Sequence, residues 1–153
     1  MALTKVQSEM AGAGQVLQVV NATYGVSTSS STNTYADTGL TATITPKFST
    51  SKILVIVNQN GVQKASTSTS FNGCSIQLLR NSTVLAQIAN GYAYTGTTID
   101  NVSGQCSTCY LDSPATTSAT TYKTQFSATQ NVASVKVQNG SETSTITLME
   151  IAG

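Results

Sequence analysis

The chain contains no histidine and no tryptophan, and only 8% of its 153 residues are charged. Without histidine, neither a Ser-His-Asp triad nor a Cys-His pair can form. The seven Lys and Arg residues are scattered from Lys5 to Lys136, so the sequence offers no basic run to attract nucleic acid. These absences exclude the commonest nucleophilic hydrolase sites and predict that nucleic acid is not a partner.

Acidic residues are also few, and they are far apart along the chain. Only Asp100 and Asp112 are plausible neighbours for carboxylate-pair hydrolysis, and Asp112 precedes Ser113-Pro114, where aspartate usually forms a turn. Calcium binding would need clustered carboxylates, and no glycine-rich phosphate loop is present. We therefore predict that the protein is not an enzyme and has no catalytic residues, no cofactor and no metal.

Long apolar stretches are missing too. The longest apolar run, residues 53–57, is far shorter than the ~20 residues of a membrane span. The N-terminus, from Met1 to Lys5, lacks the apolar core of a signal peptide. The sequence predicts a protein that folds in a cytosol and does not insert into a membrane.

The three cysteines are too few for a zinc site in a chain without histidine, because zinc takes four ligands. Cys106 and Cys109 have CxxC spacing, while Cys74 stands alone. On a strand, residues i and i+3 point to opposite faces, so a disulfide in this pair would need a bend. Free thiols packed as small hydrophobic groups are favoured, and a local disulfide or an intersubunit contact is the alternative.

Serine, threonine and amide side chains dominate, and from Gln15 onward the apolar residues recur with period two. Leu40, Ala42 and Ile44 alternate with threonines and end at Pro46, as in a half-buried strand. Residues 53–57 are apolar on both faces, so each face needs a cover. This pattern predicts an all-β fold, an antiparallel jelly-roll-like β-sandwich of about 8–10 strands.

Three connections lie between successive predicted strands. They are Asn81-Ser82-Thr83, residues 113–118, and residues 138–142. The last contains Asn139-Gly140, the strongest hairpin signal in the chain. We expect hairpin turns at Asn81-Ser82-Thr83 and at Asn139-Gly140, and a connection between two strands at residues 113–118.

Tyr92, Tyr94 and Tyr110 lie among threonines near Asn101. Such aromatic and amide-rich segments serve carbohydrate and protein recognition, because tyrosine offers a rigid apolar face with a polar tip. Ordinary strand tyrosines are the favoured alternative.

Residues 1–14 end in Ala11-Gly12-Ala13-Gly14, and such small residues cannot build a core. The segment is either a frayed terminus or an arm that docks on another protein. Residues 15–153 are expected to form one head domain.

Several segments in succession resemble virion proteins of tailed bacteriophages, mainly tail-fibre, receptor-binding and capsid-decorating modules. They are VLQVV (16–20), YADTGL (35–40), SKILV (51–55), YLDSP (110–114), TTYKTQ (120–125) and STITLMEI (144–151), and the opening MALTKV is similar to the start of many phage fibres. The resemblance implies a jelly-roll-like head that forms a homotrimer. Fibre heads usually follow a long shaft, whereas only residues 1–14 precede this one.

The favoured function is therefore a trimeric tail-fibre or receptor-binding head in the virion. Residues 1–14 would attach it to a tail, baseplate or capsid protein, and a host surface glycan or protein would be its target. Capsid decoration by a trimer is the alternative. An intracellular small-ligand-binding β-domain and a hydrolytic tailspike-type enzyme are more remote hypotheses.

Oligomerisation also has a basis in the residues. The last strand places Ile146 and Leu148 on one face and Met149 and Ile151 on the other. Together with residues 53–57, this is more two-faced apolar strand than one sandwich usually covers. Closed rotational symmetry would bury the excess.

Overall fold

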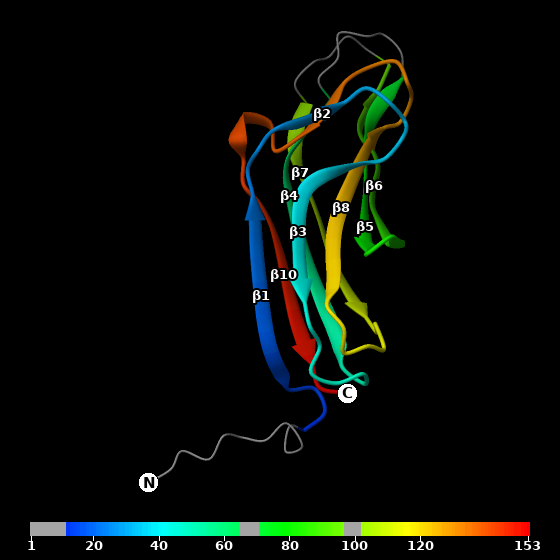
Figure 1. The fold of residues 1–153 in the computed structure, drawn as a ribbon. Coiled ribbons are helices and arrows are strands. Elements are labelled where there is room, and N and C mark those ends of the chain that lie inside the picture. Colours follow the sequence, from blue (N-terminus) through cyan, green and yellow to red (C-terminus); the bar gives the residue numbers. More distant parts are fainter. Residues whose placement is uncertain (1–11, 65–70, 97–101) are drawn as a thin grey trace.

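The computed structural model describes residues 12–64, 71–96 and 102–153, which form two packed layers of β-strands (Figure 1). The strands are β1 (Val16–Tyr24), β2 (Thr28–Ser30), β3 (Ala36–Ile44), β4 (Lys52–Lys64), β5 (Asn72–Arg80), β6 (Thr83–Thr95), β7 (Val102–Asp112), β8 (Thr120–Ala128), β9 (Val135–Val137) and β10 (Ser144–Ile151). A short 3-10 helix, η2 (Asn139–Ser141), precedes β10. Among the described residues, no helix is long and apolar enough to cross a membrane.

The strands form two antiparallel sheets. The β1 sheet has the order β1-β10-β4-β7, and β9 and β2 continue it beside the far end of β4. The β3 sheet has the order β3-β8-β5-β6. The chain crosses between the sheets repeatedly, which is the connectivity of a jelly roll. The predicted fold class is confirmed.

Period-two alternation explains how the strands face the core. In β3, Leu40, Ala42 and Ile44 are buried, while Thr41 and Thr43 between them are exposed. A β-branched threonine fits the solvated side of a pleated sheet, because its side chain packs beside its neighbours while its hydroxyl meets water. The predicted alternation in this segment is confirmed.

The core contains two apolar clusters, one toward each end of the sandwich. The cluster near the chain ends is formed by Leu40, Ala42, Ile44, Ile53, Val55, Val57, Leu78, Tyr122, Ile146 and Leu148. The other is formed by Val62, Cys74, Ile76, Phe126, Ala128, Val135 and Val137. Along β4 and β8, the residues between the two clusters are polar.

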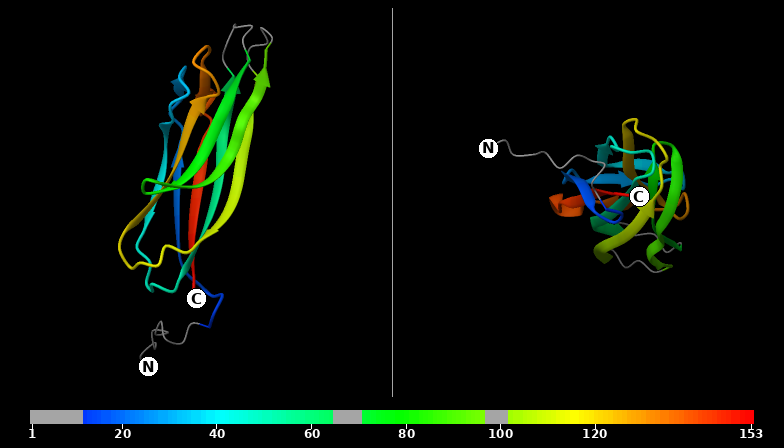
Figure 2. Two further views of the ribbon diagram at one scale, coloured as in Figure 1. Left: turned by 90° about the vertical axis from the view of Figure 1, so that its right-hand side faces the viewer. Right: turned by 90° about the horizontal axis from the view of Figure 1, so that it is seen from below.

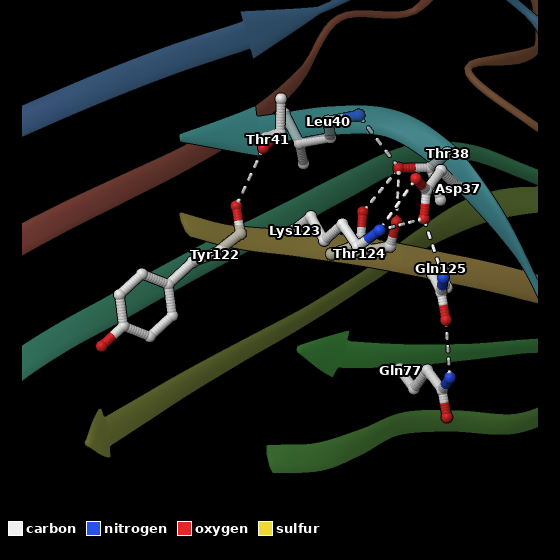
Figure 3. Close-up of polar contacts among 9 residues, drawn as sticks. All are labelled: Asp37, Thr38, Leu40, Thr41, Gln77, Tyr122, Lys123, Thr124 and Gln125. Atoms are coloured by element: carbon white, nitrogen blue, oxygen red, sulfur yellow. Dashed lines mark hydrogen bonds and ion pairs between the residues drawn. The ribbon is translucent and has the colours of Figure 1, made fainter. Parts of the chain in front are cut away.

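These polar residues form a buried belt that joins the two sheets. The hydroxyls of Thr38 on β3 and Thr124 on β8 lie 2.6 Å apart (Figure 3). Thr124 donates to Oε1 of Gln59 on β4 at 2.9 Å. Nε2 of Gln59 in turn donates to Oγ of Ser144 on β10 at 3.0 Å. The belt, defined as Thr38, Thr124, Gln59 and Ser144, therefore connects four strands through the core.

The predicted connections have different outcomes. Asn81-Ser82 joins β5 to β6 in a tight hairpin, with Arg80 paired to Thr83, as expected. Residues 113–118, predicted only as a connection between two strands, lead from β7 in the β1 sheet to β8 in the β3 sheet. A local turn signal is the same whether the chain stays in one sheet or changes sheets.

The hairpin predicted at Asn139-Gly140 is wrong. β9 pairs with β2 and β4, whereas β10 pairs with β1 and β4, and the residues between them form η2. Gly140 does adopt the left-handed φ of 66° that an Asn-Gly turn needs. Val135 and Val137 nevertheless pack into the far cluster, and this burial holds β9 away from β10.

We expect Thr124→Val to destabilise the fold by about 1–3 kcal/mol, because Oε1 of Gln59 loses its donor inside the core. Urea unfolding would measure the change. Thr121→Val on the other face of the same strand, where Thr121 contacts the Thr43 hydroxyl, is the control and should shift stability by less than about 0.5 kcal/mol. Equal stabilities for the two variants would show that the belt contributes nothing.

Glu150 fixes the connection between β3 and β4. Its carboxylate accepts Nε2 of Gln18 at 2.6 Å and the backbone amides of Lys47 at 2.7 Å and Phe48 at 3.4 Å. Burial by itself raises the pKa of Glu150, but the hydrogen bonds it accepts hold its pKa below the ordinary value of 4.5. The charged carboxylate is therefore the form that stabilises the fold.

Because the folded pKa is depressed, this contribution is complete above about pH 5 and is lost as the pH falls through the folded pKa. Glu150→Gln should lower the free energy of unfolding by about 1–3 kcal/mol at pH 7. The difference in free energy of unfolding between the variant and the parent should become smaller as the solution is acidified. Denaturant unfolding from pH 7 to pH 3 would measure it. A gap that stays constant over this range would contradict the assignment.

Candidate functional site

Asp112, the acidic residue considered for hydrolysis, lies in a buried structural contact. Both of its carboxylate oxygens are 2.9 Å from Nη1 of Arg80, and Tyr122 donates its hydroxyl to Oδ2 at 2.7 Å. Burial and this hydrogen bond raise the pKa of Tyr122, which keeps the hydroxyl protonated as a donor. The contact links the end of β7 to the β3 sheet. Asp100, the other acid of the considered pair, lies outside the described residues.

The cysteines take three different environments. Cys74 is buried, Cys106 is half-buried facing the core, and Cys109 is exposed on the opposite face of β7. All three are free thiols, as favoured from the sequence, and burial raises the pKa of Cys74 and of Cys106. Cys109 is not packed as a small hydrophobic group, so that part of the expectation is wrong. In the described ranges, no three metal-binding side chains come together.

The three tyrosines considered for recognition do not form one surface. Tyr92 packs against the far core cluster and Tyr110 against the near one. Tyr94 is 49% exposed and stacks on Phe71, which is 58% exposed, with ring centroids 5.6 Å apart. Phe71 could not be singled out from the sequence, because its partner Tyr94 is on the other strand of the hairpin. The start of β5 and the end of β6, next to which this pair lies in the sequence, are at the end of the sandwich away from the C-terminus (Figure 1).

The outer face of the β1 sheet carries a row of apolar side chains that crosses four strands. Cross-strand pairing aligns Val19 with Met149, Met149 with Leu54, and Leu54 with Leu111. The two end members, Val19 and Leu111, are 55% and 52% exposed. We call these four residues the apolar row. The outward position of Met149 and the inward position of Leu148 match the sequence-based expectation.

The surroundings of the apolar row are almost uncharged. The next row on the same face is Asn21, Thr147, Ile56 and Cys109, and Ile56 is also exposed. Among the outward-facing described residues of β1, β10, β4 and β7, only Lys52 is charged. This face therefore has no electrostatic selectivity, and its apolar side chains have no cover within the described chain.

The outer face of the β3 sheet has the opposite character. Pairing aligns Asp37, Gln125, Gln77 and Gln87 in a row across its four strands. Gln125 donates to Asp37 at 2.8 Å and accepts from Gln77 at 3.0 Å (Figure 3). Lys123 forms an ion pair with Asp37 at 2.8 Å. Burial alone raises the pKa of Asp37, but the hydrogen bonds from Lys123 and Gln125 lower it below its ordinary value. The members of this polar row therefore bond to one another and to Lys123.

No family model and no curated protein matches the sequence. The fold is similar to that of the VP2 protein in the crystal structure of the infectious bursal disease virus VP2 subviral particle. The match has 14% identity and a TM-score of 0.50, and it covers 89% of this chain and 33% of that one, so this chain spans about one third of its length. The structure of the Gt strain of the same virus matches with 14% identity and a TM-score of 0.31, covering 99% of this chain and 41% of that one. At this identity, the likeness to VP2 is one of fold.

Proposed function

We propose that the chain is a non-enzymatic structural protein of a virus particle, a trimeric head of the tail-fibre or receptor-binding kind. The apolar row on the outer face of the β1 sheet carries this proposal, because it supplies a face that copies can bury. The fold likeness to a viral protein solved as a subviral particle supports a virion role. The succession of segments from VLQVV to STITLMEI supports a tailed bacteriophage as its source.

Burial of the apolar row favours assembly energetically. Removing a valine, leucine or methionine side chain from water stabilises by about 1.5–3 kcal/mol when burial is complete. The half-buried Met149 and Leu54 gain less than the exposed Val19 and Leu111. Closed symmetry repeats this gain in every copy and ends growth at a defined number of subunits.

The position of the chain ends supports attachment through residues 1–14. The amide of Gly14 donates to the Ala152 carbonyl at 2.9 Å, and the amide of Ala152 donates to the Gln15 carbonyl at 2.8 Å. The described chain therefore begins and ends at the same end of the sandwich (Figure 2). An arm that starts there would bind a tail, baseplate or capsid protein and leave the opposite end free. Phe71 and Tyr94 at that opposite end are positioned to contact a host surface glycan or protein.

Capsid decoration is the second candidate, and the fold likeness to a particle-forming viral protein favours it. The same trimer would then sit on the shell instead of on a fibre or baseplate. Electron microscopy of purified particles labelled on this protein distinguishes the two, because the label lies on the capsid in one case and on the tail in the other.

We expect Met149→Asp to prevent assembly and Leu148→Asp to prevent folding. Asp at position 149 would place an unpaired charge in the subunit interface, at a cost of about 3–5 kcal/mol, and release folded monomers. Asp at position 148 would place the charge in the core and unfold the chain. Light scattering of the parent should give about three times the 15.8 kDa of one chain.

Thr41→Asp, exposed on the β3 sheet, is the matched control and should remain trimeric. A monodisperse parent monomer at micromolar concentration would refute the trimer. A trimeric Met149→Asp variant would show that the interface lies elsewhere.

Deleting residues 1–11 should leave the trimer intact and abolish incorporation into particles. The reason is that the proposed subunit contact is assigned to the apolar row on β1, β4, β7 and β10, whereas attachment is assigned to the arm. Light scattering measures the first property, and immunoblotting of particles purified after complementation measures the second. Normal incorporation of the truncated protein would refute the arm.

A further inference from the structure

The free edges of the β3 sheet are irregular. β3 shifts register against β8 between Asp37 and Thr41, where Gly39 has a φ of 90°. β6 shifts register against β5 at four places, and Gly91 and Ala93 within it have positive φ angles. Bulges of this kind bend an edge and prevent another strand from pairing with it.

The free edges of the β1 sheet are regular over long stretches, with one register shift in each edge pairing, between Val16 and Gln18 of β1 and between Gln59 and Val62 of β4. β7 pairs with β4 without a break from Cys106 to Asp112, and β1 pairs with β10 without a break from Gln18 to Tyr24. Neither stretch contains proline or glycine, and the only charge is at the terminal Asp112. No other strand in the described ranges pairs with the outer side of β1 or β7. Regular, uncharged edges with unpaired backbone groups accept a further strand.

The strand directions determine which edges can meet. Successive strands in the order β1-β10-β4-β7 are antiparallel, so β7 runs opposite to β1. The edge of β7 in one copy is therefore antiparallel to the edge of β1 in a neighbour that has the same orientation. Such a repeat keeps all N-termini at one end, as attachment to one surface requires. Antiparallel pairing of β7 with β7 would instead turn the two copies in opposite directions.

We propose that β7 of each copy pairs with β1 of the next, so that three β1 sheets close into a three-sided prism around the apolar rows. This inference rests on the proposed trimer and names the surface that forms it. Four strands about 4.8 Å apart make each side about 19 Å wide, which places each sheet roughly 5–6 Å from the axis. Sheets packed face to face lie about 10 Å apart, so the three rows meet at contact distance. Little charge is brought to the axis, because Lys52 is the only charged residue among the outward-facing described residues of β1, β10, β4 and β7.

Three-fold rotation keeps each residue at its own height along the axis. The apolar row therefore continues from Leu111 of one copy to Val19 of the next. The neighbouring row likewise brings Cys109 of one copy beside Asn21 of the next. Within one chain, Cys109 and Asn21 are both exposed and lie on the two opposite edge strands of the sheet. Only another copy can therefore bring them together.

This pairing can be tested by cross-linking the full chain with Asn21→Cys and its native Cys109. The purified protein is oxidised with diamide, which takes up the two electrons and two protons released by each disulfide. Denaturing electrophoresis without reductant should show most of the protein at three times the single-chain mass, and reductant should reverse it. A short bismaleimide, which joins thiols over a wider range of geometry, should give the same product.

Two variants are the controls. Asn21→Cys combined with Cys109→Ser should give no covalent trimer, and neither should Thr41→Cys on the outer face of the β3 sheet. A protein that is trimeric in light scattering but is cross-linked by neither reagent overturns the edge pairing and leaves the proposed trimer standing. A monomer overturns both. A disulfide-linked dimer of the parent through Cys109 also overturns the proposal, because it requires β7 to meet β7.

Discussion

The hydrogen bond from Thr124 to Gln59 fixes how the two sheets sit on one another. The apolar pattern of the strands excludes a slip of one residue, because such a slip turns every side chain to the other face. A slip of two residues preserves the apolar pattern, and the belt disfavours it. In that register, the Thr124 hydroxyl and the Gln59 amide would lie unpaired inside the core. The buried polar residues thus select one register among those that hydrophobicity leaves equivalent.

Once the register is fixed, the character of each outer face follows from pairing across the strands. The polar row of the β3 sheet satisfies its own donors and acceptors through Asp37, Gln125 and Gln77, so it gains little from a partner. The apolar row of the β1 sheet cannot be satisfied in this way, because apolar surface is stabilised only by removal from water. The same sandwich therefore has one face suited to solvent and one suited to burial.

The sequence predicted what depends on neighbouring residues. The alternation in β3, the hairpin at Asn81-Ser82 and the opposite faces of Leu148 and Met149 all follow from period two. It did not predict pairings between distant segments. Residues 113–118 and Asn139-Gly140 carry turn signals that do not tell a hairpin from a crossing. The apolar row joins β1, β4, β7 and β10, so it becomes visible only when the strand order is known.

Because the chain carries few charges, the difference between the edge strands of the two sheets indicates where further strands can pair. A chain with 8% charged residues has little electrostatic repulsion with which to keep its edges apart, so bulges must protect them. Bulges interrupt both edges of the β3 sheet, whereas β1 from Gln18 to Tyr24 and β7 from Cys106 to Asp112 pair with their neighbours without a break. Open pairing at these edges would build an endless sheet, whereas a closed ring consumes every edge. Three copies also suit the packing distance, because four sides of about 19 Å would hold opposite sheets about 19 Å apart and leave the axis empty.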